Sequence, residues 1–91
     1  MLKISEGKAT KQTLLLRLEG RVVGPWVHEL RQICEPLVRD GSKLALDLAD
    51  VTFADGDGVT LLAGLGARGV KLLNAMPFVE EQLKSASLSP S

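Results

Sequence analysis

Four aspartates in the middle of the chain are the first candidates for chemistry. They are Asp47, Asp50, Asp55 and Asp57. Carboxylates at such short spacing could hold a metal ion. The EF-hand calcium pattern fails, however. Two registers place Asp55 and Asp57 on ligand positions. In one of them Val59 falls on another ligand position, and in the other Phe53 does. The residue types favour a turn and a helix cap, with a magnesium site of one or two carboxylates as the alternative.

The segment from Gly64 to Gly69 matches G-x-G-x-x-G, the pattern of a dinucleotide-binding turn. In such a site the motif follows a strand and opens a helix, so that free N–H groups meet the pyrophosphate. Here the segment closes an expected helix and precedes an expected strand. No acidic residue lies about 20 positions further on. We interpret the segment as close packing and a helix C-cap.

Nucleophilic catalysis lacks the parts of a catalytic set. The one histidine, His28, and the one cysteine, Cys34, lie six residues apart on one expected helix, so the helical turn points them away from each other. We expect Cys34 in the core and His28 on the surface. The sequence therefore predicts no enzyme and no cofactor.

Length and composition bound the class of protein. Of the 91 residues, 45% are hydrophobic, and eleven basic residues balance eleven acidic ones. No overall field therefore favours binding to nucleic acid or to an anionic membrane. No apolar run approaches the roughly 20 residues of a bilayer-spanning helix, and no secretory signal opens the chain. We expect one soluble, cytoplasmic domain over residues 1–91, with residues 87–91 as a disordered tail.

The middle of the chain predicts a strand, a tight turn and a helix in succession. The expected strand Lys43–Leu48 contains the run Leu44–Leu48, which is apolar except for the single charge of Asp47 and suits a buried strand. Asp55–Gly58 is a polar, glycine-rich turn. The helix is expected from Gly58 to about Ala67, with Gly69 ending it. Asp57 is expected to be its N-cap, because a carboxylate there can accept hydrogen bonds from free N–H groups.

The remaining elements follow from apolar periodicity and from glycine and proline. Gly24-Pro25 starts a helix with one apolar stripe, Pro36 should kink it, and Asp40-Gly41-Ser42 ends it. The stripe contains Val27, Leu30, Ile33, Cys34, Leu37 and Val38. The other expected segments are an edge strand Met1–Ile4, a polar connection Ser5–Gln12, a strand Thr13–Leu18, a strand Gly69–Asn74, and a helix Met76–Ala86 with Phe78, Val79 and Leu83 facing inward.

The order of these segments is strand, strand, helix, strand, helix, strand, helix. Strands that alternate with helices after an opening hairpin indicate an α/β fold. We expect a mixed β-sheet of about four strands with helices packed on it.

The sequence LDLADVTFADGDGVTLL resembles the STAS domain, the fold of bacterial anti-sigma-factor antagonists and of domains appended to sulfate transporters. The similarity runs from about Thr13 to Leu83. It includes the opening LEGRVVGPWV-x-EL, the approach V-x-F-x-D to the turn, and the strand GVKLLN. The resemblance implies a STAS-like fold and a protein-binding function.

In the antagonists that this chain resembles, the turn is Asp-Ser-Ser-Gly, and a partner kinase that is itself the anti-sigma factor phosphorylates the first serine. Residue by residue, Asp55 matches the aspartate, Gly56 the phosphorylated serine, Asp57 the second serine and Gly58 the glycine. Gly56 has no hydroxyl, so phosphorylation at that position is excluded here. Thr60 is the fallback acceptor, one helical turn further on.

We expect the docking face on the turn and on the exposed side of the following helix. Leu61 is its expected apolar anchor, the alternative being that the final helix covers Leu61. Trp26 is either a partner contact or a cover for the edge of the core. The predicted partner-binding residues are Asp55, Gly56, Asp57, Gly58, Thr60, Leu61 and Trp26.

Three hypotheses about function follow. The first is a non-enzymatic STAS module, an antagonist-like regulator of transcription in bacteria without the phosphorylatable serine. Its partner would be a protein such as an anti-sigma factor or kinase. The second is a small STAS subunit of an ABC-type lipid transporter or of a signalling complex. The third is a nucleotide-binding domain, although Asp55 and Asp57 would repel phosphate unless a metal intervenes. A weak homodimer is possible in each.

Overall fold

The computed structural model describes residues 2–8 and 12–88. Its elements confirm the predicted order of strands and helices. They are β1 (Leu2–Lys8), β2 (Thr13–Val22), α1 (Pro25–Arg39), β3 (Lys43–Ala54), α2 (Gly56–Ala67), β4 (Lys71–Leu73) and α3 (Pro77–Leu88). Within the described residues, each helix is too short or too polar to span a bilayer.

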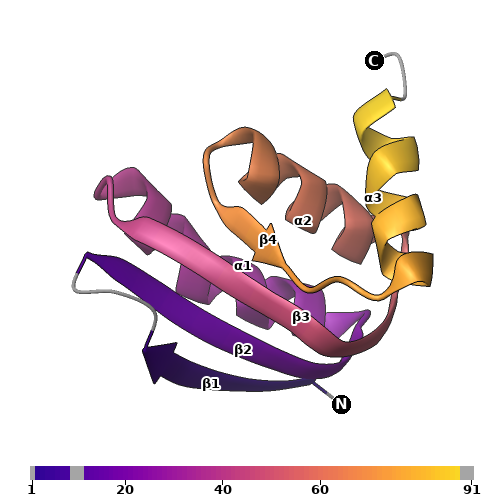
Figure 1. The fold of residues 1–91 in the computed structure, drawn as a ribbon, viewed down its shortest axis with the longest axis horizontal. Coiled ribbons are helices and arrows are strands. Elements are labelled where there is room, and N and C mark those ends of the chain that lie inside the picture. Colours follow the sequence, from indigo (N-terminus) through magenta and orange to yellow (C-terminus); the bar gives the residue numbers. More distant parts are fainter. Residues whose placement is uncertain (1, 9–11, 89–91) are drawn as a thin grey trace.

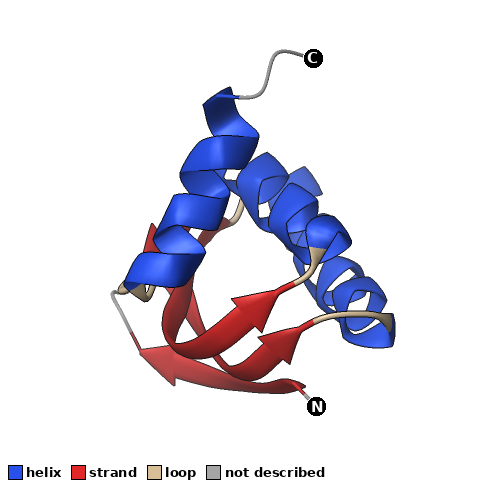
Figure 2. Ribbon diagram, turned by 90° about the vertical axis from the view of Figure 1, so that its right-hand side faces the viewer, coloured by secondary structure: helices blue, strands red, loops and turns tan. Residues whose placement is uncertain are grey.

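The strands form one mixed sheet in the order β1-β2-β3-β4. β1 is antiparallel to β2, whereas β2 and β3, and β3 and β4, are parallel pairs. Parallel neighbours need a crossover connection, and α1 and α2 supply the two crossovers. In Figure 1 both helices pass behind the sheet, and Figure 2 shows the helices and the strands as separate layers. The predicted mixed sheet with helices packed on it is thus confirmed.

Alternating side chains give the sheet a covered face and an open face. In β2, Leu16 and Leu18 are buried, while Arg17 between them is exposed, as the period of two in a strand requires. Side chains of α1 and α2 complete the core over the covered face. The most deeply buried side chains are Leu18, Val22, Leu30, Cys34, Leu46, Leu48, Val51, Leu62, Leu65 and Val79.

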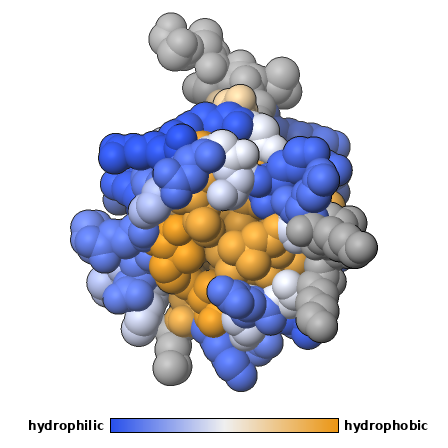
Figure 3. Space-filling view, turned by 90° about the vertical axis from the view of Figure 1, so that its left-hand side faces the viewer, coloured by the Kyte–Doolittle hydropathy of each residue, from blue (hydrophilic) through white to orange (hydrophobic). Residues whose placement is uncertain are grey.

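The core reaches the surface at the end of the molecule where β1 ends and β2 begins. Figure 3 views that end and shows apolar side chains framed by hydrophilic ones. A domain of this size buries only roughly 60–65% of the surface of its unfolded chain. Half-buried apolar side chains therefore border the core, among them Ile4, Leu14, Leu37 and Val38.

The first two strands are longer than predicted. β1 continues beyond Ile4 to Lys8, because residues 5–8 pair with β2 instead of forming a polar connection. Residues 9–11 of that expected connection lie outside the described residues. β2 continues beyond Leu18 to Val22, although the sequence predicts that the strand ends at Leu18. Two shifts in its register against β3 and a positive φ of 110° at Gly20 allow the strand to continue.

Several other boundaries also differ from the prediction. β3 runs on from Leu48 to Ala54, whereas β4 covers only Lys71–Leu73. α3 ends at Leu88, so Ser87 and Leu88 belong to a helix and not to the predicted tail. Residues 89–91 of that tail lie outside the described residues. By contrast, α1 continues past Pro36 and ends at Arg39, which agrees with its predicted limits.

Leu61 is part of the core, and its predicted exposure is wrong. Its side chain is only 7% exposed. The reason is that α2 packs against α1 on one side and α3 on the other, as well as against the sheet. A helix enclosed in this way can be apolar nearly all round without a partner protein. Leu61 therefore cannot serve as an exposed anchor.

One residue of α1, Ile33, is more exposed than predicted, and Trp26 takes one of its two expected positions. Ile33 belongs to the predicted apolar stripe, yet it is 37% exposed, because its side chain lies at the edge of the core. Trp26 is half-buried and packs against the core cluster. Of the two alternatives for Trp26, this position favours a cover for the edge of the core.

The burial of Leu61 gives a first prediction. Leu61→Glu should unfold the domain or lower its free energy of unfolding by several kcal/mol, because the change places an unpaired charge in the core. Thr60→Glu is the matched control, since Thr60 is the exposed neighbour on the same helix. It should stay within about 0.5 kcal/mol of wild type. Urea unfolding followed by circular dichroism measures both, and equal stability of the two variants would contradict the assignment.

Candidate functional site

Asp55 is the N-cap of α2. One carboxylate oxygen, Oδ1, accepts a hydrogen bond from the Gly58 amide at 2.7 Å, and the Asp55 carbonyl accepts from the Val59 amide at 2.8 Å. The predicted cap at Asp57 is wrong. Asp57 lies within the first turn of the helix and is exposed. The reason is that α2 begins two residues earlier than expected, so the cap moves from Asp57 to Asp55.

The second oxygen of Asp55 ties α2 to the start of α1. Oδ2 accepts a hydrogen bond from the Gly24 amide at 2.9 Å. Gly24 has a positive φ of 54° and provides no side chain to cap α1. The Asp55 amide in turn donates to the Val22 carbonyl at 3.1 Å. One residue therefore joins the end of β3 to the end of β2 and to the starts of both helices.

These contacts change the acidity of Asp55. The hydrogen bonds from the Gly24 and Gly58 amides hold the pKa of the Asp55 carboxyl below its ordinary value, against a smaller opposing effect of burial. The ionised form is the one that accepts both bonds. At neutral pH the clamp is therefore fully formed.

Gly58 is required by close packing, whereas Gly56 is not. A Cβ at Gly58 would collide with the carbonyl oxygen of Val22, and it would also press on the side chains of Val22 and Ala54. At Gly56 a Cβ would meet nothing within 4 Å. The two glycines of the turn thus have different roles: Gly58 lets α2 approach β2, and Gly56 leaves an open space on the surface.

The structure brings together only part of the predicted docking face. Gly56, Asp57 and Thr60 are exposed around the start of α2, and Asp55 is half-exposed beneath them. The Thr60 hydroxyl donates a hydrogen bond to the Gly56 carbonyl at 2.9 Å. Gly58, Leu61 and Trp26 are buried or half-buried and contribute packing. We call Asp55, Gly56, Asp57 and Thr60 the turn surface.

An aromatic pair beside this surface is absent from the sequence prediction. Phe53 and Phe78 stack with their ring centroids 6.1 Å apart. Phe78 was expected to face inward with Val79 and Leu83, but it is 58% exposed. Val79 is fully buried and Leu83 packs against the core. The spacing within α3 carries no signal for this exposure, because the burial of a helical residue depends on the neighbours that pack against it.

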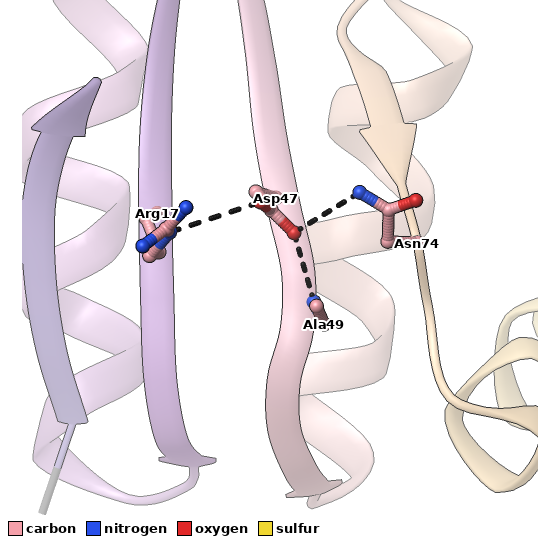
Figure 4. A network of polar contacts seen from close by, with 4 residues as sticks. All are labelled: Arg17, Asp47, Ala49 and Asn74. Carbon is pink, nitrogen blue, oxygen red and sulfur yellow. Dashed lines mark hydrogen bonds and ion pairs between the residues drawn. The ribbon is translucent and has the colours of Figure 1, made fainter.

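Asp47 belongs to a polar network on the open face of the sheet. Figure 4 shows its carboxylate between Arg17 and Asn74. Oδ1 accepts hydrogen bonds from the Ala49 amide at 3.0 Å and from the Asn74 side chain at 3.4 Å. Oδ2 lies 3.8 Å from Nε of Arg17. The network accounts for one of the four aspartates without a metal. Across residues 2–8 and 12–88, no three potential His, Cys, Asp or Glu ligands gather at one point.

The remaining nucleophile, Cys34, is inert. It is fully buried on α1, and burial together with the charge of Glu35 raises the pKa of its thiol to about 11. His28 is exposed. The predicted positions of both residues are confirmed.

The different roles of the two glycines give a second prediction. Gly58→Ala should lower the free energy of unfolding by about 1–3 kcal/mol, because the added methyl group overpacks the contact with Val22. Gly56→Ala should be neutral or stabilising, since alanine fits the open space and favours a helix. Thermal or urea unfolding of the two variants and of wild type measures these differences in stability. A stable Gly58→Ala variant would contradict the close approach of α2 to β2.

The Asp55 clamp predicts a dependence on pH. The folded pKa lies below the unfolded value of about 3.9, so the clamp stabilises the fold fully above that pH and loses its effect as the pH falls through the folded pKa. Asp55→Asn should lower Tm at pH 7, and the difference from wild type should shrink in acid.

Asp57→Asn is the control for this experiment, because the exposed Asp57 forms no clamp. Its Tm should stay close to that of wild type at every pH. Melting curves from pH 7 down to pH 3 test both variants. The cap assignment fails if Asp57→Asn shows the larger loss.

No protein-family model and no curated protein matches the chain. Among solved structures, it is similar to the anti-sigma factor antagonist SpoIIAA in its unphosphorylated form, with a TM-score of 0.73 and 20% identity over 91% of this chain and 83% of that one. The phosphorylated form of SpoIIAA, a Bacillus cell fate determinant, also gives a TM-score of 0.73 at 20% identity, over 94% and 85% of the two chains. The chain therefore has the fold of SpoIIAA, the STAS fold that its strand–turn–helix sequence resembles.

Proposed function

We propose that this chain is a non-enzymatic module that binds a partner protein through the turn surface. The observation that carries the proposal is the Asp55 clamp. It holds the start of α2 to the β2–α1 connection by hydrogen bonds of 2.7 and 2.9 Å. Gly56 and Asp57 are thereby presented on a fixed and exposed surface. A binding surface that is already ordered loses little conformational entropy when a partner docks.

The shared fold supports a regulator of the antagonist type, acting on transcription in the bacterial cytoplasm. SpoIIAA is described as an anti-sigma factor antagonist with unphosphorylated and phosphorylated forms. In this chain Gly56 occupies the position that the resemblance assigns to the phosphorylated serine. A glycine cannot form a phosphate ester, so binding would not be switched at that position. The fallback acceptor, Thr60, has its hydroxyl engaged with the Gly56 carbonyl.

The absence of a catalytic role is part of the proposal. The groups best suited to chemistry have structural tasks: Cys34 is buried, Asp47 lies in the network on the sheet, and Asp55 caps two helix starts. The domain would then act by binding a partner and not by catalysing a reaction.

A nucleotide-binding domain is disfavoured by the same geometry. A phosphate group would need free amides at the start of α2. The Asp55 carboxylate already accepts from the Gly58 amide, and exposed Asp57 adds negative charge in the first turn. A transporter or signalling subunit would use the same turn surface, so the identity of the partner distinguishes it from a regulator of transcription.

The proposal predicts that a bulky residue at Gly56 blocks partner binding. Gly56→Trp should fold normally, because the space around the position is open. The affinity for the partner should fall at least tenfold, about 1.4 kcal/mol. Gln32→Trp on the exposed face of α1 is the matched control, and it should bind like wild type.

Tagged wild-type, Gly56→Trp and Gln32→Trp proteins are incubated with extract of the cells that make the protein, and bound proteins are quantified by mass spectrometry. The proposal requires a protein that wild type and Gln32→Trp enrich and that Gly56→Trp loses. Identical enrichment by all three would overturn it. Circular dichroism confirms that each variant is folded.

A further inference from the structure

Both phenylalanines of the chain lie on the surface, stacked on each other. The rings of Phe53 and Phe78 are 6.1 Å apart with an angle of 17° between their planes. Phe53 is 36% exposed and Phe78 is 58% exposed. Leu73 and Met76, in the chain that leads into α3, are 37% and 39% exposed. Single exposed apolar residues are common, but two exposed aromatic rings held together form a distinct apolar patch.

The aromatic pair is fixed next to the turn surface. Phe53 lies two residues before Asp55 at the end of β3. Gln82, one helical turn after Phe78, donates a hydrogen bond from Nε2 to the Ala54 carbonyl at 2.9 Å. This bond fastens α3 to the end of β3. These two links place the aromatic pair close to the turn surface, at the end of the sheet where β3 meets α2.

An exposed carboxylate lies next to Phe78 on α3. Glu81 lies three residues after Phe78 on α3, close enough for side chains on one helix face to be neighbours. Glu81 is exposed and, among the described residues, forms no ion pair, whereas Glu80 pairs with Lys84 at 3.5 Å. Exposed Asp57 adds a further negative charge in the first turn of α2.

A positive side chain lies on the strand next to Phe53. Arg21 on β2 is the register partner of Phe53 and is exposed. The carboxylate of Glu81 instead lies one helical turn from Phe78 on α3. A cation from a partner would therefore be attracted to the Phe78 side of the pair.

We propose that the aromatic pair extends the turn surface and receives a partner segment with an apolar side chain next to an arginine or lysine. The cation lies over the ring of Phe78 and pairs with Glu81, because an aromatic face and a carboxylate both attract it. The apolar side chain packs on the exposed edge of the pair, as anchors do in interface centres. This inference rests on the proposed function, since it names the chemistry of the partner for the same binding area.

Photo-crosslinking in the cells that make the protein tests this inference. p-Benzoylphenylalanine replaces Phe78, Thr60 or Ile33 in three separate variants. Position 60 reports the turn surface, because Thr60 is exposed there and the open space at Gly56 is left for the partner. Position 33 is the control, because Ile33 is an apolar side chain of α1 with 37% exposure. Mass spectrometry identifies each captured protein and the peptide attached, and circular dichroism confirms each fold.

The expected result is that positions 78 and 60 capture the same protein and that position 33 does not. The peptide attached at position 78 should contain an arginine or lysine beside an apolar residue. Glu81→Gln should lower the yield at position 78 severalfold at low salt, and Glu80→Gln should not, because Glu80 is already paired with Lys84.

Other outcomes overturn the inference in distinguishable ways. Capture at position 60 without capture at 78 leaves the proposed function standing and removes the aromatic pair from the interface. Capture of a second copy of this chain at position 78 replaces the partner by self-association. A captured peptide without a cation rejects the stated partner chemistry. Failure at both positions 60 and 78 rejects the proposed function as well.

Discussion

The carboxylate of Asp55 links the starts of the two crossover helices, α1 and α2. Its two oxygens accept hydrogen bonds from the amides of Gly58 and Gly24, at the starts of α2 and α1. These amides would otherwise be free donors, because the first N–H groups of a helix have no partner within it. The same residue donates its own amide to Val22 at the end of β2. The position of each crossover helix on the sheet thus depends on one ionised side chain, whose lowered pKa reflects that demand.

The clamp works only because the backbones come close together. Gly58 touches the carbonyl of Val22 with no side chain between them, so α2 can sit deep against the carboxyl end of β2. Leu61 and Leu62 then enter the core beside α1 and β3. Packing and hydrogen bonding support each other here: the glycine contact sets the depth of the helix, and the carboxylate sets its starting point. What remains on the surface is a short polar area around Gly56 and Asp57.

Structural positions and exposed positions alternate within a few residues at the start of α2. Asp55 and Gly58 hold the fold together, whereas Gly56 and Asp57 are exposed. The exposed ring of Phe78 belongs to α3, which is fastened to the end of β3 by a hydrogen bond. Under the proposed function, these groups would form a binding area whose availability does not depend on phosphorylation at position 56, because Gly56 has no hydroxyl.

The sequence alone determined the order of elements and the mixed sheet, because apolar periodicity and the glycine and proline breaks are local signals. It also placed Cys34 in the core and showed that Gly56 lacks a hydroxyl. Tertiary structure decided the rest. The cap fell on Asp55 and not on Asp57, because a cap depends on where a helix starts, and α2 starts two residues earlier than the local pattern indicates. Leu61 was buried and Phe78 exposed because burial depends on which neighbours pack on each side of a helix. Such contacts join residues far apart in the chain, and no spacing within one helix records them.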